Sequence, residues 1–229
     1  MLLHIPALLT ADELSHCRAT LKNAQWTDGR ETAGIQSAKS KNNLQLPRDS
    51  EACRELGEVV LRALGRNALF NSAVLPYRVS PPLFNRYDSG MSVGAHVDNA
   101  IRGILAAGIH TRIRTDVSST LFLADPDEYD GGELTIHTNG NEQAIKLPAG
   151  DMVLYPTTAL HSVTPVTRGS RVAAFFWSQS MIAEESRRQI MFDLDMQVTL
   201  LRERLGDSDP AVLSLTNIYH NMMRQWCIL

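Results

Sequence analysis

The tripeptide His96-Val97-Asp98 and the later residue His161 are the side chains whose types could hold a metal ion. In extended backbone, residues i and i+2 project to the same side, so His96 and Asp98 could grip one ion while Val97 turns away. Two imidazoles and one carboxylate form the ligand set of mononuclear non-haem Fe(II) oxygenases, which leaves other metal positions open. Open positions suit a reaction in which a cosubstrate and O₂ must both reach the metal.

Arg171 is a candidate anion-binding residue, because it opens the last β-forming run of the chain after His161. A guanidinium stays charged and presents a planar fork to a carboxylate. At the end of a pocket away from the metal, Arg171 would hold the far carboxylate of a dicarboxylic keto acid.

Each candidate also has a purely structural interpretation. His96 could be a surface or hydrogen-bonded histidine, and Asp98 could belong to a turn. Arg171 could begin a strand and pair with a carboxylate at its edge. We favour the metal site because all these residues occur together and in this order, with His161 between Asp98 and Arg171.

The region from about 74 to 178 predicts the β structure that would position these residues. Short runs rich in Val, Ile, Leu, Thr and aromatic residues alternate there with Gly, Pro, Asn and Asp. This pattern is typical of an antiparallel sandwich or barrel, and without alternating long helices a doubly wound parallel sheet is not expected. The predicted runs are 83–87, 119–123, 133–137, 144–147, 152–155 and 171–177.

Helical patterns come before this region. A predicted strand over 2–9 leads into a capping box, with Thr10 as N-cap and Glu13 as its reciprocal residue. An apolar stripe predicts a second helix from about 48 to 64. The polar segment 27–47 between these helices is interpreted as an exposed connection.

Two sets of basic residues have two interpretations. One set lies within 27–47, and the other consists of Arg102, Arg112 and Arg114, which follow the His96 motif. We interpret both sets as solvated surface. The alternatives are substrate binding by the 27–47 segment and contact of the three arginines with an anionic substrate.

The end of the chain predicts two helices. Apolar residues recur at three- and four-residue steps from Ile190 to Leu205, and Gly206 ends this first helix. Asp209 and Pro210 begin the second helix as N-cap and first residue. We interpret the two helices as packing on each other and on the β core. The alternative is a homo-oligomer surface, because so short a hairpin buries its apolar stripe incompletely alone.

Composition excludes several classes of protein. The chain has 229 residues, is 44% hydrophobic and carries a net charge of −3, so no strong positive charge attracts nucleic acid or an anionic membrane. Its three cysteines form no CxxC pair, which argues against a thiolate zinc site or a disulfide framework and fits a reducing compartment. No apolar run approaches the roughly 20 residues that cross a bilayer, and we interpret the first residues as a strand and not as a signal peptide. We therefore expect a cytoplasmic protein.

Three segments carry a family pattern: 85–98 (NRYDSGMSVGAHVD), 130–134 (DGGEL) and 161–171 (HSVTPVTRGSR). In order and spacing they resemble the Fe(II)- and 2-oxoglutarate-dependent dioxygenases of the prolyl-4-hydroxylase type. The resemblance is strongest to the bacterial PKHD-type hydroxylases, which are associated with iron uptake. It covers nearly the whole chain, including the helical end.

The resemblance implies an α+β chain with a mainly β core. Its fold would be a double-stranded β-helix, or jelly roll, with N-terminal helices and a C-terminal helical appendage. The dioxygenase domain would span 1–178, with its jelly-roll core over about 74–178, and the appendage would span 179–229.

The resemblance also implies the site. Its Fe(2+) ligands map onto His96, Asp98 and His161, and its 2-oxoglutarate anchor maps onto Arg171, where many prolyl hydroxylases have Lys and the PKHD branch has Arg. Tyr87 matches a tyrosine that lines the cosubstrate pocket, although core filling is the alternative for it. Beyond the metal ligands no catalytic residue is expected. The implied cofactors are Fe(2+), 2-oxoglutarate and O₂ as cosubstrates, and L-ascorbate.

The implied reaction is hydroxylation of an unidentified small-molecule or peptide substrate, with release of succinate and CO₂. One alternative is a cupin-like metal-binding sensor or isomerase without 2-oxoglutarate, because Pro-Ala-Gly-Asp over 148–151 before a β run is similar to such barrels. No His-x-His pair occurs, however, and Arg171 would then have no function. A second alternative is a noncatalytic interaction module on a jelly roll.

Overall fold

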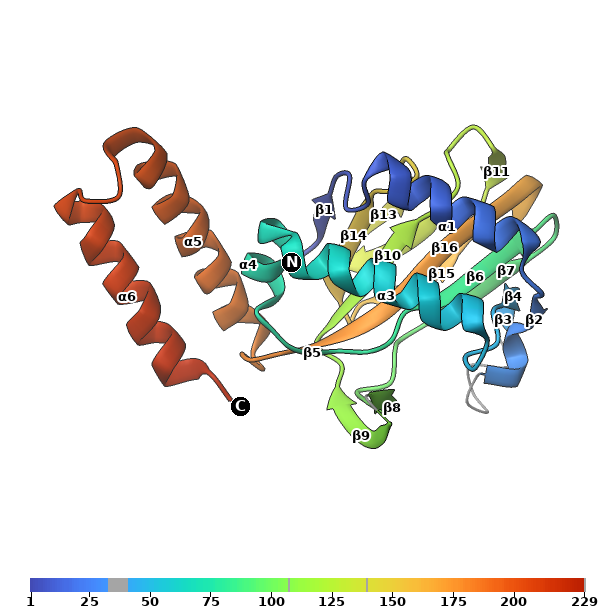
Figure 1. Cartoon of the computed structure of the whole chain (residues 1–229), viewed down its shortest axis with the longest axis horizontal. Coiled ribbons are helices and arrows are strands. Elements are labelled where there is room, and N and C mark those ends of the chain that lie inside the picture. The colour runs from blue at the N-terminus through green and yellow to red at the C-terminus, as the bar shows by residue number, and fades with distance from the viewer. Residues whose placement is uncertain (33–40, 107, 139, 229) are drawn as a thin grey trace.

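Two antiparallel sheets form the centre of the computed structural model, which describes residues 1–32, 41–106, 108–138 and 140–228 (Figure 1). In spatial order, the larger sheet contains β1 (Leu3–Ile5), β14 (Met152–Pro156), β10 (Val117–Phe122), β16 (Val166–Ser180), β6 (Leu83–Asp88), β4 (Leu44–Gln45) and β2 (Thr27–Asp28). The strands β5 (Pro76–Val79) and β11 (Tyr129–Gly131) also pair with β16. The smaller sheet contains β13 (Asn141–Ile145), β12 (Leu134–Thr138), β15 (Leu160–Val163), β7 (Ser92–His96) and β3 (Lys41–Asn42).

The two sheets face each other across a shared apolar core. Phe122 and Val153 from the larger sheet join Ile136 and Val163 from the smaller sheet in one buried cluster. Alternating side chains explain this arrangement, because every second residue of a strand points to the same face. The mainly antiparallel jelly-roll expectation is therefore confirmed.

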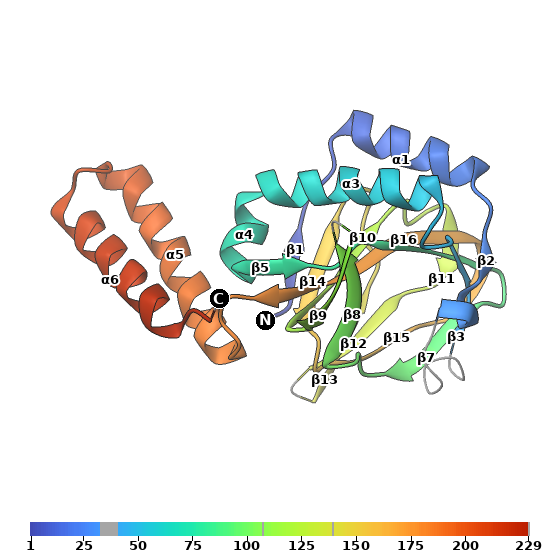
Figure 2. The same ribbon diagram turned by 60° about the horizontal axis from the view of Figure 1, so that its bottom comes forward.

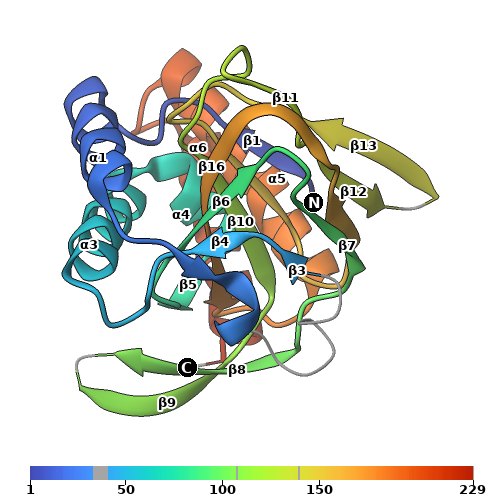
Figure 3. The same ribbon diagram turned by 90° about the vertical axis from the view of Figure 1, so that its right-hand side faces the viewer.

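Two helices cover the outer face of the larger sheet (Figures 2 and 3). The helix α1 (Ala11–Asn23) begins with the predicted capping box of Thr10 and Glu13. The helix α3 (Glu51–Arg66) begins later than expected, because the Ser50 side chain caps it by accepting a hydrogen bond from the Cys53 amide. The short helix α4 (Ala68–Val74) was not predicted, since it contains only two turns and starts directly after α3.

One N-terminal prediction is too long and another is wrong. The strand expected over 2–9 ends at Ile5, because Pro6 has no amide hydrogen and Ala7 adopts a φ of 45°. The segment 27–47 is more than an exposed connection: it contains β2, the 3₁₀ helix η1 (Gly29–Thr32), β3 and β4, and Gln45 is fully buried. Residues 33–40 of that segment lie outside the described residues.

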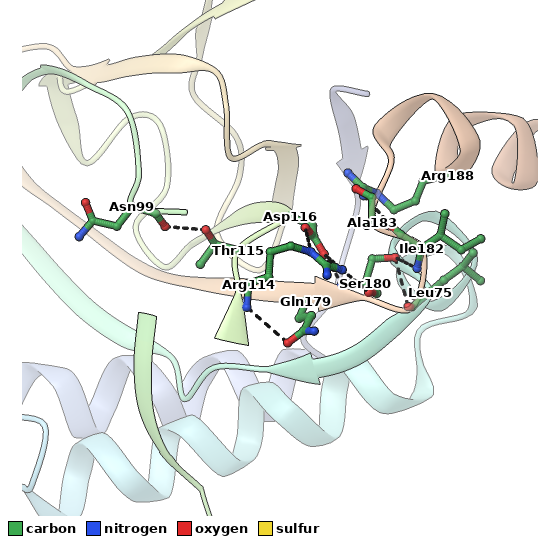
Figure 4. Close-up of polar contacts among 10 residues, drawn as sticks. All are labelled: Leu75, Asn99, Arg114, Thr115, Asp116, Gln179, Ser180, Ile182, Ala183 and Arg188. Atoms are coloured by element: carbon green, nitrogen blue, oxygen red, sulfur yellow. Dashed lines mark hydrogen bonds and ion pairs between the residues drawn. The ribbon is translucent and has the colours of Figure 1, made fainter. Parts of the chain in front are cut away.

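A two-stranded arm leaves the jelly roll between β7 and β10. It consists of β8 (Ile101–Ala106) and β9 (Ile109–Arg114), which pair in register with each other. Figure 4 shows how its base is fixed: the Thr115 hydroxyl donates to the Asn99 carbonyl at 2.6 Å, and Arg114 pairs with Asp116 at 2.7 Å. Asp116 also accepts a hydrogen bond from the Ser180 amide at 2.8 Å, so the arm is tied to the end of β16.

The C-terminal helices form a hairpin that stands beside the jelly roll (Figures 1 and 2). The helix α5 (Glu185–Leu205) ends at Gly206 as predicted, and the helix α6 (Pro210–Trp226) begins after its predicted cap Asp209. The helix α5 packs against α4, and buried Met191 joins a cluster with Leu75. Phe192 of α5 also packs against the main core cluster, so the hairpin contacts the rest of the chain at its α5 side. Within the described residues, no helix has the length and apolar character needed to span a membrane.

Candidate metal centre

Strand pairing brings the two candidate histidines together. His96 at the end of β7 lies directly opposite His161 in β15, and their ring centroids are 4.3 Å apart. Asp98 follows β7 closely enough that its Oδ2 atom lies 3.7 Å from His161 Nε2. The potential ligand atoms of the three residues all lie within 4.8 Å of one another. In the part of the chain that the structure describes, this is the single such group of histidine, cysteine and acidic residues.

Backbone carbonyls orient both imidazoles. His96 Nδ1 lies 2.9 Å from the Gly94 carbonyl oxygen, and His161 Nδ1 lies 3.0 Å from that of Ala159. Because a carbonyl only accepts hydrogen bonds, each Nδ1 carries the proton and each Nε2 presents a lone pair to a metal. Burial lowers the pKa of His161, which favours the neutral ring that a metal ligand needs.

A hydroxyl holds the candidate carboxylate ligand. Ser118 Oγ of β10 donates a hydrogen bond of 2.8 Å to Asp98 Oδ2, and it lies 3.1 Å from the Thr157 hydroxyl. These contacts join Asp98, which follows a strand of the smaller sheet, to the larger sheet. No sequence pattern indicated Ser118, because a buried serine within a strand has no distinctive spacing.

Ser118→Ala is expected to weaken metal binding by roughly 10- to 100-fold, because the carboxylate ligand loses the group that orients it. Anaerobic titration with Fe(II) measures this change. Ser119→Ala is the matched control, since the Ser119 hydroxyl has no hydrogen-bond partner among the described residues. Equal Fe(II) affinity of the two variants would contradict the orienting role of Ser118.

Arg171 and Tyr87 lie opposite each other on β16 and β6. The Arg171 guanidinium is 5.2 Å from the Tyr87 ring and 5.4 Å from the Phe122 ring, and the residue is only 2% exposed. Within the described residues, its Nε atom has no hydrogen-bond partner and no carboxylate forms an ion pair with it. A buried cation without an anion is costly, so Arg171 is suited to an anionic ligand.

Tyr87 is buried at the same place. Its hydroxyl accepts a hydrogen bond of 3.2 Å from Asn85, and burial raises the pKa of Tyr87, which keeps the phenol neutral. Tyr87 and Arg171 line the same cavity as the three candidate metal ligands. The cavity therefore joins a candidate metal site and a candidate anion site, one on each sheet.

Tyr155 is a cavity residue that the sequence did not reveal. It belongs to β14, it is 4% exposed, and its ring stands edge-on to the His161 ring with 5.1 Å between centroids. Burial raises the pKa of Tyr155, with Asp98 raising it further and Arg171 opposing the change. The tyrosine is therefore within electrostatic reach of both ends of the site. Nothing in its strand distinguishes it from a core aromatic residue.

The chemistry of these side chains fits a ferrous ion and a keto diacid. Two neutral imidazole nitrogens and one carboxylate oxygen converge within one cluster, which is a facial donor set that suits Fe(II). The unpartnered Nε of Arg171 fits a carboxylate at the far end of the diacid.

Family models match two parts of the chain. The model of the 2OG-Fe(II) oxygenase superfamily matches residues 82–179, which contain all the candidate site residues. The model described as the PKHD-type hydroxylase C-terminal domain matches residues 185–227, which cover the α5–α6 hairpin.

Curated relatives match over the full chain. A PKHD-type hydroxylase of Gluconacetobacter diazotrophicus is 66% identical over 229 residues, which is 100% of both proteins. A PKHD-type hydroxylase of Pseudomonas aeruginosa is 53% identical over 226 residues, which is 99% of both proteins.

Solved structures support the fold. A prolyl-4-hydroxylase from Pseudomonas putida has a TM-score of 0.53 at 19% identity, covering 78% of this chain and 92% of that one. A prolyl hydroxylase from Trichoplax adhaerens has a TM-score of 0.54 at 14% identity, covering 82% and 86%. With the jelly roll and the full-length relatives taken together, the chain belongs to the PKHD-type hydroxylases and is an Fe(II)- and 2-oxoglutarate-dependent dioxygenase.

Proposed function

We propose that this enzyme hydroxylates a C–H bond of a small-molecule or peptide substrate, with Fe(2+) held by His96, Asp98 and His161 and 2-oxoglutarate held by Arg171. The observation that carries the proposal is the convergence of these four residues on one cavity. Tyr87 is proposed to line the cosubstrate end of that cavity beside Arg171.

When bound, iron and 2-oxoglutarate supply the oxidative decarboxylation that releases succinate and CO₂ and oxidises the substrate. The protein supplies geometry and charge. The two imidazoles are oriented by backbone carbonyls, which leaves their Nε2 atoms available to hold the ion. Arg171 fixes the direction of the diacid by binding its far carboxylate. The neutral phenols of Tyr87 and Tyr155 can donate hydrogen bonds to the diacid without adding negative charge to the cavity.

Three finer statements belong to the same proposal. L-ascorbate sustains turnover, and the reaction serves iron uptake; both rest on the resemblance of this chain to the family. The enzyme works in the cytoplasm, which is supported by its cysteines, since Cys17, Cys53 and Cys227 are all free.

The test is a substrate screen that measures succinate. The purified enzyme is given Fe(II), 2-oxoglutarate, O₂ and ascorbate, and is screened against peptides and iron chelators. We expect succinate release that requires 2-oxoglutarate and rises with one class of added substrate. Metal binding without any effect of 2-oxoglutarate would favour the cupin-like alternative, and a chain that binds neither would be an interaction module.

We also propose that the α5–α6 hairpin forms a homo-oligomer interface. It leaves large apolar side chains exposed, including Ile190 at 49%, Leu213 at 56% and Ile218 at 46%. Light scattering during size-exclusion chromatography is expected to give a dimer mass for the wild-type enzyme and a monomer mass for Leu213→Arg. A wild-type monomer at all concentrations would contradict this proposal.

A further inference from the structure

The cavity carries more positive charge than the metal site and cosubstrate require. Lys41, Arg48 and Arg102 line it in addition to Arg171, while Asp98 is the single acidic residue among its described lining. A ferrous ion, Asp98, the dianion 2-oxoglutarate and Arg171 would together carry no net charge. The charges of Lys41 and Arg102 are therefore not balanced by the expected contents of the site.

Arg102 is held in a fixed position on the cavity wall. Its guanidinium lies 3.7 Å from the centroid of the buried Trp177 ring, a stacked arrangement that favours Arg. On the arm, Arg102 is paired in register with Ile113, which is 1% exposed and packs in a cluster with Trp177. The expectation that Arg102 is solvated is therefore wrong, because the arm places its guanidinium against the Trp177 ring of β16.

The base of the arm connects the strand that carries Arg102 to the segment that carries Asp98. The Thr115 hydroxyl donates to Asn99 O, and the Thr115 amide donates to Ala100 O at 2.9 Å (Figure 4 shows the first of these bonds). Asn99 follows Asp98 directly and also lines the cavity. The segment that carries the metal ligand thus leads into the arm that carries Arg102.

Lys41 lies beside Arg102. Its ammonium is 5.7 Å from the centroid of the Phe175 ring, and that ring meets the Trp177 ring edge-on with 5.3 Å between centroids. The two cations therefore sit over adjoining aromatic rings of β16. Burial lowers the pKa of Lys41 to about 8, and repulsion from Arg102 and Arg48 acts in the same direction. In the part of the chain that the structure describes, no ion pair links Lys41 or Arg102 to a carboxylate.

The other two arginines of the 102–114 region differ from Arg102. Arg114 is paired with Asp116, and Arg112 is exposed on β9 and does not line the cavity. The charge of Arg114 is therefore compensated by a carboxylate and that of Arg112 by solvent, whereas neither explanation applies to Arg102. Like charges held close together on a partly buried wall are unfavourable unless an anion lies between them.

We propose that Lys41, Arg102 and Trp177 form the binding site for an anionic group of the substrate that is hydroxylated, either a carboxylate or a phosphate. This inference rests on the proposed function and adds the charge of the substrate to it. Arg102, with one face on Trp177, offers its planar N–H donors to the anion, and Lys41 adds a second charged donor. The anion holds the substrate in the cavity that also contains His96, Asp98 and His161.

The test uses simple anions and a metal that does not turn over. The enzyme is loaded with Mn(II) and N-oxalylglycine, an inert analogue of 2-oxoglutarate, so that Arg171 is occupied. Methylphosphonate and trifluoroacetate are the phosphate-like and carboxylate probes. Calorimetry measures their affinity, and ³¹P or ¹⁹F relaxation by Mn(II) shows whether they bind near the metal.

We expect saturable binding close to Mn(II), weakened about tenfold or more by Arg102→Gln and by Lys41→Gln, because each loses a charge-assisted hydrogen bond. Arg102→Lys should lose less, since it keeps the charge. Arg112→Gln is the matched control: it removes the same charge from the same arm, outside the cavity, and should bind the probes as the wild type does.

Probe affinity that is the same in Arg102→Gln, Lys41→Gln and Arg112→Gln would overturn the inference, as would no probe binding to enzyme that holds Mn(II) and the analogue. If Arg102→Gln fails to fold, the comparison of probe affinity between Lys41→Gln and Arg112→Gln tests the inference. Preference for one probe identifies the anionic group. Failure of Mn(II) to bind would contradict the proposed function instead. Calorimetry of the probes with the wild type and the variants would then still show whether Lys41 and Arg102 bind an anion.

Discussion

Asp98→Ala is expected to reduce Fe(II) binding and 2-oxoglutarate-dependent succinate release to background. Two imidazoles without the carboxylate leave the facial donor set incomplete, and the negative charge that attracts the cation is lost. The fold should survive, because Asp98 follows the end of β7 and contacts the larger sheet through the Ser118 hydroxyl rather than through core packing. Anaerobic Fe(II) titration and succinate measurement on the same preparations test both parts.

Asp130→Ala is the control for this variant. Asp130 is an exposed carboxylate that pairs with Arg168 outside the cavity, so its removal should leave both iron binding and turnover as they are. Full activity of Asp98→Ala would remove Asp98 from the site. An equal loss in both variants would show that the effect is not specific to the proposed ligand.

Arg171→Ala is expected to raise the KM for 2-oxoglutarate by about a hundredfold while Fe(II) affinity changes little. The guanidinium is buried and has no other anionic partner among the described residues, so its removal deprives the diacid of a desolvated charge pair. Arg171→Lys should lose only part of this affinity, because a point charge replaces the planar fork. Steady-state succinate kinetics at varied 2-oxoglutarate measure the effect.

Arg168→Ala provides the comparison on the same strand. Arg168 belongs to β16 but is exposed and paired with Asp130, so its loss should leave the KM for 2-oxoglutarate unchanged. An unchanged KM in Arg171→Ala would show that another cation holds the far carboxylate. Lys41 and Arg102, which line the same cavity, would then be the residues to replace next.

The sequence predicts local features well where one short pattern has one physical meaning. The capping box at Thr10, the end of α5 at Gly206 and the start of α6 after Asp209 depend on neighbouring residues alone, and the structure has all of them. The candidate ligands could be named for a different reason. Their residue types are rare in combination, and their order along the chain resembles a family.

Features that depend on tertiary contacts could not be predicted. The arm of β8 and β9 places Arg102 on Trp177, although the two residues are far apart in sequence. The carbonyls that orient the imidazoles and the Ser118 hydroxyl carry no sequence signal, because any residue has a carbonyl and serine is common. The apolar stripe expected on α5 is buried only in part: Val198 is 3% exposed, whereas Ile190 and Leu205 near the two ends of the helix are exposed, because the hairpin stands beside the jelly roll.

The central claim is that two imidazoles and one carboxylate bind a single ferrous ion beside a guanidinium that holds the diacid. Anaerobic visible spectroscopy tests it most directly, because a weak charge-transfer band requires iron and 2-oxoglutarate to be bound together. We predict that the wild-type enzyme shows this band only when both are added, that Asp98→Ala lacks it, and that Arg171→Ala needs far more 2-oxoglutarate to produce it. A wild-type enzyme that shows no band, or a band of equal strength in Asp98→Ala, would contradict the account.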